Sequence, residues 1–359
     1  MAKERVWIGF DLGSRLTHVC VIADDGTTLH EQESETKPDD LENALASFPV
    51  DRIGLIAVEA GADTHVVRRL RADGFPIAIF EARKANKFLT LRRNKTDASD
   101  ARGLADLARL GRHTVSQVHL KTPECQQLRG LLVMRNRLVI MRVTAENALR
   151  SRLAMYGLPF KASHRPGGAR EQVEALIAEL SGYEQIDIRP EVAPLVDLCE
   201  SLRTAVSKLN WDLEKRARSY EVCRLLMEVP GVGSISALSF YSAIEDPTRF
   251  ERASDVAAYL GLTPRRYQSG QVSRTRGITK TGSKMTRTHL VNAAKVFGAR
   301  APDGALKDWY LSLRARAGPR RAHVALARKL AVILATIWRN GTHFEANPKR
   351  PPSRGRGLT

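Results

Sequence analysis

The sequence predicts a mixed α/β sheet in its N-terminal part and long helices in the rest of the chain. Three short strands come in quick succession, at Val6 to Phe10, Thr17 to Ala23 and Thr27 to Gln32, with a hairpin turn at 24–26. The next strand, Ile53 to Val58, is continuously apolar, as is typical of a parallel strand buried on both faces. We therefore expect an antiparallel meander joined to parallel crossover units in one sheet.

Helices alternate with the strands that follow. A helix from about Pro38 to Phe48 precedes the fourth strand, and a helix from Thr64 to Ala72 leads to the strand Ile77 to Phe80. This order is that of an RNase H-like mixed sheet, in which the first and fourth strands lie side by side. Asp11 ends the first strand and Glu59 ends the fourth, so we expect their carboxylates to emerge close together.

Two further carboxylates open the next helix. Thr96 is the expected N-cap, and Asp97 and Asp100 then lie on one side of the first turn. Acids in a first turn can simply complement the helix dipole, but four converging carboxylates repel one another unless cations neutralise them. Hard oxygen ligands favour Mg²⁺ or Mn²⁺. The sequence thus predicts a divalent-metal site for phosphoryl transfer at Asp11, Glu59, Asp97 and Asp100, with Arg92, Arg93 and Lys95 holding a nucleic-acid strand.

Composition indicates a globular nucleic-acid-binding protein. In 359 residues, 57 Lys and Arg outnumber 39 Asp and Glu, which gives a net charge of +18 and favours phosphate-rich partners. The apolar run Leu330 to Trp338 is too short to span a membrane, so we expect no membrane partner and a cytoplasmic location. The four cysteines are widely separated, and this spacing suggests neither a zinc site nor a disulfide framework.

Long helices are predicted in the middle of the chain. One begins with Thr122 as N-cap and Pro123 at its first position and ends near Gly157, a length of about 50 Å. Another covers roughly Arg170 to Leu180. A third, from Pro190 to Tyr220, carries leucines at alternating spacings of three and four, which is typical of a coiled-coil seam. The seam can close within the chain or on another subunit.

The C-terminal part combines helices with a basic loop. The turn at 230–233 lies between helices and either presents backbone N–H groups to phosphate or is only a tight turn. A helix is expected at Ala253 to Leu260 and further helices at 290–297, 309–316 and 323–338. Between them we predict a basic loop that contains Arg265, Arg266, Arg274, Arg276, Lys280, Lys284 and Arg287 as nucleic-acid contacts.

Several of these motifs together resemble the insertion sequence 110 family of transposases. They are Asp11, Glu59-Ala60-Gly61, Asn94 to Ala101, Pro230 to Gly233, Gly261 to Arg266, Ser269-Gly270 and Gly277 to Lys280. The resemblance follows the family's order over nearly the whole chain. It implies a RuvC-like domain at 1–157, a helical coiled-coil linker at 158–220 and a mostly helical transposase domain at 221–345. The segment 346–359 is rich in Pro, Arg and Gly, and this composition predicts a basic disordered tail.

The resemblance also implies a mechanism and partners. Asp11, Glu59, Asp97 and Asp100 would be the catalytic metal ligands, and Ser269 would be the nucleophile that joins covalently to DNA. The partners would be double-stranded DNA at the element ends and target, and a structured noncoding guide called a bridge RNA. The leucine seam and the need to bring two DNA partners together predict a homo-oligomer, a dimer or a tetramer. No nucleotide cofactor is expected, because a covalent intermediate keeps the energy of the broken bond.

The sequence departs from the family at two places. No aromatic residue follows Glu59 within 61–65, and Gln271 follows Ser269-Gly270 where many relatives have a second glycine. The aromatic residue that the family often has after this glutamate, and any contact it makes with the substrate, therefore has no counterpart in this sequence. The second keeps Ser273 and Thr275 as weaker candidates for the nucleophile.

Other functions are compatible with parts of the pattern. A RuvC-like nuclease could use the four acids to activate water, with Ser269 structural, and a non-catalytic nucleic-acid-binding protein would leave the acids merely solvated. The turn at 11–14 is similar to the phosphate turn of sugar kinases of the actin-like superfamily. The sequence has no second such turn and no adenosine-binding Gly-Gly segment, which disfavours the kinase.

Overall fold

The computed structural model describes residues 4–61, 64–89, 96–161, 167–181, 186–269 and 272–346. For residues 88–89, 181, 266–269 and 272–276 it describes the backbone but not the side chains. The chain divides into two compact units, with the boundary between Lys121 and Thr122. Each unit is described separately below.

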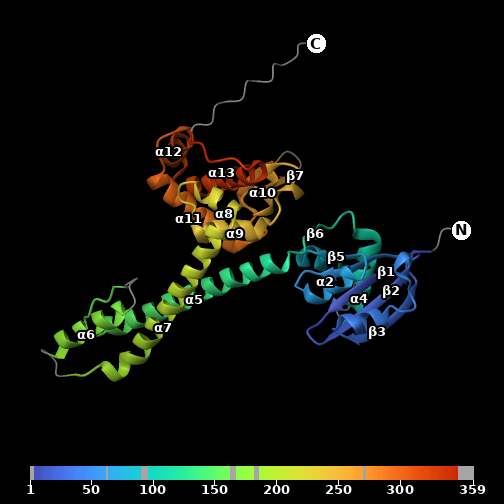
Figure 1. The fold of residues 1–359 in the computed structure, drawn as a ribbon, viewed down its shortest axis with the longest axis horizontal. Helices are drawn as coiled ribbons and strands as arrows, with labels where there is room; N and C mark the ends of the chain where they lie inside the picture. The colour runs from blue at the N-terminus through green and yellow to red at the C-terminus, as the bar shows by residue number, and fades with distance from the viewer. Residues whose placement is uncertain are drawn as a thin grey trace, which may run out of the picture. The chain divides into compact units, whose positions relative to one another are not determined.

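A mixed sheet forms the centre of the first unit (Figure 1). Its strands within the described residues are β1 (Val6–Leu12), β2 (Leu16–Ala23), β3 (Thr28–Glu35), β4 (Ile53–Glu59), β5 (Ile77–Phe80) and β6 (Gln117–Val118). They are ordered β3-β2-β1-β4-β5-β6, with β1, β4 and β5 parallel and the other neighbours antiparallel. The prediction that the first and fourth strands lie side by side is confirmed.

Helices cover both faces of this sheet because its strands are apolar on both sides. Ile8 and Phe10 pack with α1 (Pro38–Ala44) and α2 (Thr64–Ala72), whereas Trp7 packs with α3 (Ala82–Leu89) and α4 (Asp97–Asp106). Helix α1 is shorter than predicted, because the chain leaves the helix after Ala44 and packs Leu45 and Phe48 against the sheet. A short 3₁₀ turn, η1 (Val50–Arg52), leads into β4, and a π-helical turn, η2 (Leu107–Gly111), extends α4.

Two long helices open the second unit. They are α5 (Pro123–Ala154) and α7 (Arg189–Ser219), joined through α6 (Gly168–Ser181). They run antiparallel, because α5 residues of rising number meet α7 residues of falling number, from Arg135 with Asn210 to Glu146 with Arg203. Thr122 caps α5 as predicted, and its Oγ1 accepts the N–H of Cys125 at 3.3 Å. The predicted long helix thus belongs to the second unit.

Part of the predicted leucine seam of α7 packs within the chain. Leu202 packs in one buried cluster with Leu149 and Leu153 of α5, and Leu213 packs in another with Leu132. Leu198 of the same repeat is 44% exposed, so the intramolecular contacts account for only some of its positions.

The C-terminal helices pack around one apolar core. They are α8 (Glu221–Met227), α9 (Ser234–Ile244), the 3₁₀ turn η3 (Pro247–Arg249), α10 (Ala253–Tyr259), α11 (Lys284–Arg300), α12 (Ala305–Ala317) and α13 (Pro319–Asn340). The turn between α8 and α9 approaches α11 closely, since a Cβ added to Gly231 would lie 2.4 Å from the carbonyl oxygen of Ala293. In the described residues, no helix has the length and hydropathy to cross a membrane.

One prediction for this region is wrong. The segment expected to be a basic loop is a hairpin of two strands, β7 (Pro264–Ser269) and β8 (Val272–Ile278). Tyr267, Val272 and Thr275 favour a strand, but the arginines between them interrupt the apolar alternation that predicts one. The two strands of the hairpin pair through their backbones, although their sequence contains no continuous apolar alternation.

Candidate active site

Asp11 and Glu59 lie on neighbouring parallel strands at the same edge of the sheet. Phe10 of β1 pairs with Val58 of β4, and the two acids are the next residues on each strand. Strands in a sheet are separated by roughly 4.8 Å. Because side chains alternate, Asp11 lies on the same face as Trp7, and Glu59 on the same face as Ala57, which is the face that α4 covers. Both acids are half-buried.

The first turn of α4 brings Asp97 and Asp100 to this edge. The Thr96 cap is as predicted: its Oγ1 accepts the N–H of Ser99 at 3.1 Å, and its own N–H donates to Ser99 Oγ at 2.9 Å. Helix α4 lies directly on β1, since a Cβ added to Gly9 would fall 1.9 Å from the carbonyl oxygen of Ala101. The start of the helix lies toward the Asp11 end of the strand, because Oδ2 of Asp97 lies 3.8 Å from Nε2 of His18, which pairs with Asp11.

His18 is a residue at this edge that the sequence reasoning did not single out. It pairs with Asp11 across β1 and β2 and shares a face with Cys20. Its Nε2 lies 3.8 Å from Oδ2 of Asp97 and 3.9 Å from Oε1 of Glu33. The turn at 13–15 between β1 and β2 sets this register, so counting outward from that turn along the two strands would have placed His18 beside Asp11.

The four carboxylates have the oxygen donors that suit a divalent cation. Within the described ranges, no three Asp, Glu, His or Cys side chains are grouped closely enough to hold a metal ion. Asp97 is 76% exposed, which leaves its carboxylate room to move. All four donors are hard oxygens at one end of the sheet, a donor set that suits Mg²⁺ or Mn²⁺. This edge could therefore bind a metal and a phosphate after side-chain rearrangement.

Ser269 is the last residue of β7, and its backbone pairs with Val272. Ser273 pairs with Gln268, and Thr275 with Arg266, so the alternative nucleophiles lie on β8 of the same hairpin. The side chains of these residues lie outside the described part of the structure. What the structure does describe is the hairpin's place in the fold, as a two-stranded extension from the C-terminal helices.

The base of the hairpin is held by backbone contacts. The N–H of Thr279 donates to the carbonyl oxygen of Thr263 at 2.9 Å, and that of Lys280 donates to Gly261 at 3.1 Å. A Cβ added to Gly261 would lie 2.4 Å from the nitrogen of Thr281, so only glycine allows this approach. Lys280 has a φ of 59°, in the left-handed region, as a result of this packing.

The predicted nucleic-acid contacts divide into three groups. Arg92, Arg93 and Lys95 lie outside the described residues, and the side chains of Arg266, Arg274 and Arg276 do as well. Arg265, Lys280 and Lys284 are exposed around the base of the hairpin. These three remain available to phosphate.

Arg287 requires a correction. Its side chain is buried, and Nη1 donates to the carbonyl oxygen of Leu260 at 3.1 Å and to that of Thr281. Burial lowers the pKa of this guanidinium. Arg287 therefore ties the loop before α11 to the end of α10 and does not face a nucleic acid.

Comparison with known proteins identifies two family matches. A DEDD transposase family model of the IS110 type matches residues 8–157, and a model described as the IS116/IS110/IS902 transposase family matches residues 223–310. The first includes all four acids, and the second includes the hairpin with Ser269.

Individual relatives match most of the chain. The transposase for insertion sequence element IS1111A of Coxiella burnetii is 29% identical over 349 residues, covering 95% of this chain and 92% of its own length. The transposase for element IS1328 of Yersinia enterocolitica is 27% identical over 350 residues, covering 94% and 98%. A relative from Sinorhizobium fredii is 30% identical over 301 residues, covering 81% and 74%.

Proposed function

The chain belongs to the IS110 family of insertion-sequence transposases, and from this premise we propose that it is an RNA-guided recombinase that exchanges DNA strands through a phosphoserine intermediate. The observation that carries the proposal is the convergence of Asp11, Glu59 and the first turn of α4 at one edge of the sheet. Such an edge suits phosphodiester chemistry, because a cation there offsets both the acids and the phosphate.

In this mechanism, Ser269 Oγ attacks a DNA phosphorus and the bond to the 3′-oxygen breaks. The serine loses its proton and the departing 3′-hydroxyl gains one, so the number of phosphoester bonds stays constant. A second 3′-hydroxyl then attacks the phosphoserine and releases Ser269, which explains why no nucleotide cofactor is needed. When bound at the four acids, a divalent metal would polarise the phosphate and favour the serine alkoxide.

Exposed cations supply the contacts that hold DNA in this proposal. Arg265, Lys280 and Lys284 surround the base of the hairpin that ends at Ser269. Lysine and arginine at such positions neutralise backbone phosphates without reading bases. Sequence choice is then left to the guide RNA, whose involvement is supported by the family membership and by the charge of +18.

The decisive experiment compares single substitutions in DNA cleavage assays on denaturing gels. Ser269→Ala should lose both cleavage and the covalent protein–DNA adduct. Asp97→Asn should also lose both, and its fold should be retained. The matched control is Asp106→Asn on the same helix, at its other end, where the carboxylate lies 3.7 Å from Arg102 and Arg109. This control should retain the adduct.

Two outcomes would change the mechanism. Continued cleavage by Ser269→Ala at the element ends would favour a nuclease in which the acids activate water. The observation behind that second function is that all four acids lie in the first unit, which could act without the hairpin. An adduct that mass spectrometry maps to Ser273 would move the nucleophile to β8.

Assembly into a homo-oligomer is part of the proposal. Because Leu202 and Leu213 of the α7 seam pack within the chain, we propose that exposed residues of α5 join the subunits. Val133, Met134, Ile140 and Met141 of α5 are 44–57% exposed, and each pair recurs after seven residues, as in a coiled coil. Ile140→Glu should reduce the mass measured by light scattering, and Gln127→Glu, on an exposed turn of the same helix, should not. A strict monomer for the native chain bound to DNA would remove this part.

Mixing two inactive variants tests whether the site is composite. Ser269→Ala lacks the nucleophile and Asp97→Asn lacks a metal ligand, so a mixed oligomer can rebuild one complete site only if the two units come from different subunits. Partial recovery of adduct formation in the mixture would indicate sites shared between subunits. No recovery would place both halves in the same chain.

A further inference from the structure

We infer that α7 carries a stacking site for an unpaired nucleotide, centred on Trp211 and flanked by Lys208 and Lys215. The inference rests on the assignment of the chain as a nucleic-acid enzyme and extends it to a surface that is separate from both the acids and the hairpin. It identifies the partner by chemistry: a base that is free to stack, with a phosphate on each side.

The exposure of Trp211 is the first observation. The structure describes all four tryptophans, and Trp211 is 65% exposed, whereas Trp7 is buried and Trp309 and Trp338 are partly buried against the C-terminal core. Single exposed apolar residues are common and need no explanation by themselves. A tryptophan is different because it offers a large, rigid ring with few rotamers, which is why it is enriched where partners bind.

The charges around the ring are the second observation. Lys208 and Lys215 precede and follow Trp211 by three and four residues, so all three lie along one side of the helix. Both lysines are exposed, and Nζ of Lys215 lies 5.7 Å from the centre of the ring. Their backbones are about 10 Å apart along the helix axis. The lysines can therefore reach the two phosphates that flank one nucleotide stacked on the ring.

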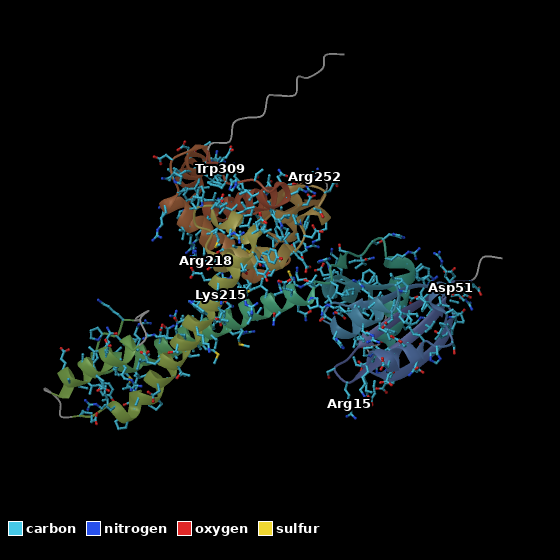
Figure 2. The ribbon with its side chains drawn as sticks, viewed as in Figure 1. Arg15, Asp51, Lys215, Arg218, Arg252 and Trp309 are labelled. Atoms are coloured by element: carbon cyan, nitrogen blue, oxygen red, sulfur yellow. The ribbon has the colours of Figure 1, made fainter. Side chains whose placement is uncertain are left out.

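The neighbouring charges support the same assignment. Arg218 continues the row, and its Nη2 lies 2.7 Å from Oε1 of Glu214, so that acid is already paired. Figure 2 shows Lys215 and Arg218 projecting from α7. An apolar protein partner would have to desolvate the lysines beside the ring, whereas a nucleic acid neutralises them.

The surface is also rigid. On the other side of the same helical segment, Leu213 and Ala217 are completely buried against the core that includes α5. The ring is thus presented on a fixed support and not on a loop. In a duplex the bases already stack on each other, and extracting one costs energy. The site should therefore select an unpaired base, whether from a loop of an RNA or from an opened DNA strand.

The test measures binding by the full chain without cleavage, using short oligo(dT), short oligo(rU) and a blunt DNA duplex. Trp211→Ala should weaken binding of the single-stranded probes about tenfold and leave duplex affinity unchanged. In the wild-type chain, a base stacked on Trp211 should quench tryptophan fluorescence when the single-stranded probe binds. Trp211→Phe should keep most of the affinity but lose this quenching. Replacing both lysines with alanine should lower the slope of log affinity against log salt by about 1.4.

Trp309→Phe is the matched control, because this ring lies under Lys329 at 3.9 Å on another helix. It should leave affinity and quenching unchanged. Tighter binding of oligo(rU) would assign the site to RNA, and tighter binding of oligo(dT) to an opened DNA strand. Wild-type affinity of Trp211→Ala for both single strands, or an equal loss for the duplex, would overturn the inference. Either result leaves the phosphoserine mechanism untouched, because the adduct assay does not depend on it.

Discussion

Replacing Gly9 by alanine should disable the acidic edge without touching any acid. The added Cβ would lie 1.9 Å from the carbonyl oxygen of Ala101 and 2.4 Å from the nitrogen of Ala105, where ordinary contact begins at 3.4 Å. The clash is with backbone atoms, so no side-chain rotation relieves it. Helix α4 must move away from β1 by about 1.5 Å, the difference between 3.4 and 1.9 Å. Such overpacking costs about 3 kcal/mol.

The displacement should cost more in activity than in folding. Asp97 and Asp100 move with α4, whereas Asp11 and Glu59 stay on the sheet, and a misplacement of about 1 Å can reduce a rate about 100-fold. We expect Gly9→Ala to unfold at lower urea concentration and, where still folded, to form the DNA adduct about 100 times more slowly.

The matched control for this substitution is Gly130→Ala in α5. No heavy atom lies within 4 Å of the added Cβ there, so this variant should gain about 0.5–1 kcal/mol and keep full activity. Wild-type stability and adduct formation in Gly9→Ala would refute the close packing of α4 on β1, and with it the placement of the acids.

Three further predictions concern the buried groups. Burial lowers the pKa of His289 to about 4, below its unfolded value of 6.5. The stabilisation is therefore complete above pH 6.5 and lost as pH falls toward 4, by up to about 3 kcal/mol; urea unfolding of His289→Gln should show a smaller pH dependence. Arg203, whose Nη2 lies 3.1 Å from Oε1 of buried Glu146, should cost about 3–5 kcal/mol when changed to methionine. Much of that loss should be recovered when Glu146 is also replaced, and no recovery would mean the pair is not coupled. Burial raises the pKa of Cys20 to about 12, so an alkylating reagent should leave this thiol unmodified at pH 8 until the protein is unfolded; rapid labelling of the native chain would contradict this.

The sequence predicts the sheet well because its strands are marked by continuous apolar runs or by alternation of apolar and polar residues. The strand Ile77–Phe80 and the helix Thr64–Ala72 have the predicted bounds. The hairpin β7–β8 was missed for the opposite reason: its residues include many arginines and its pairing is specified by backbone geometry. Likewise, a seam of leucines has the same spacing whether it closes on α5 or on another subunit, so the sequence alone could not decide between them.

The site is partly predictable for the same physical reason. Asp11 and Glu59 follow from strand order, and Thr96 is a cap by type and position. Burial of an arginine cannot be seen in a basic run, so Arg287 was grouped with its exposed neighbours although it binds two carbonyl oxygens. The position of His18 beside Asp11 depends on the register of a hairpin, and its immediate neighbours in sequence do not indicate it.

The open arrangement of the acids has a consequence for control of the reaction. Asp97 and Asp100 lie at the positive end of α4, which stabilises their charges without a cation. Asp11 and Glu59 are half-buried on the sheet and lack such a dipole of their own. In the proposed mechanism, a cation bound at this edge would offset the charges of both pairs. In the proposed mechanism, a site that is complete only when cation and DNA are both bound would not cut DNA during a brief encounter.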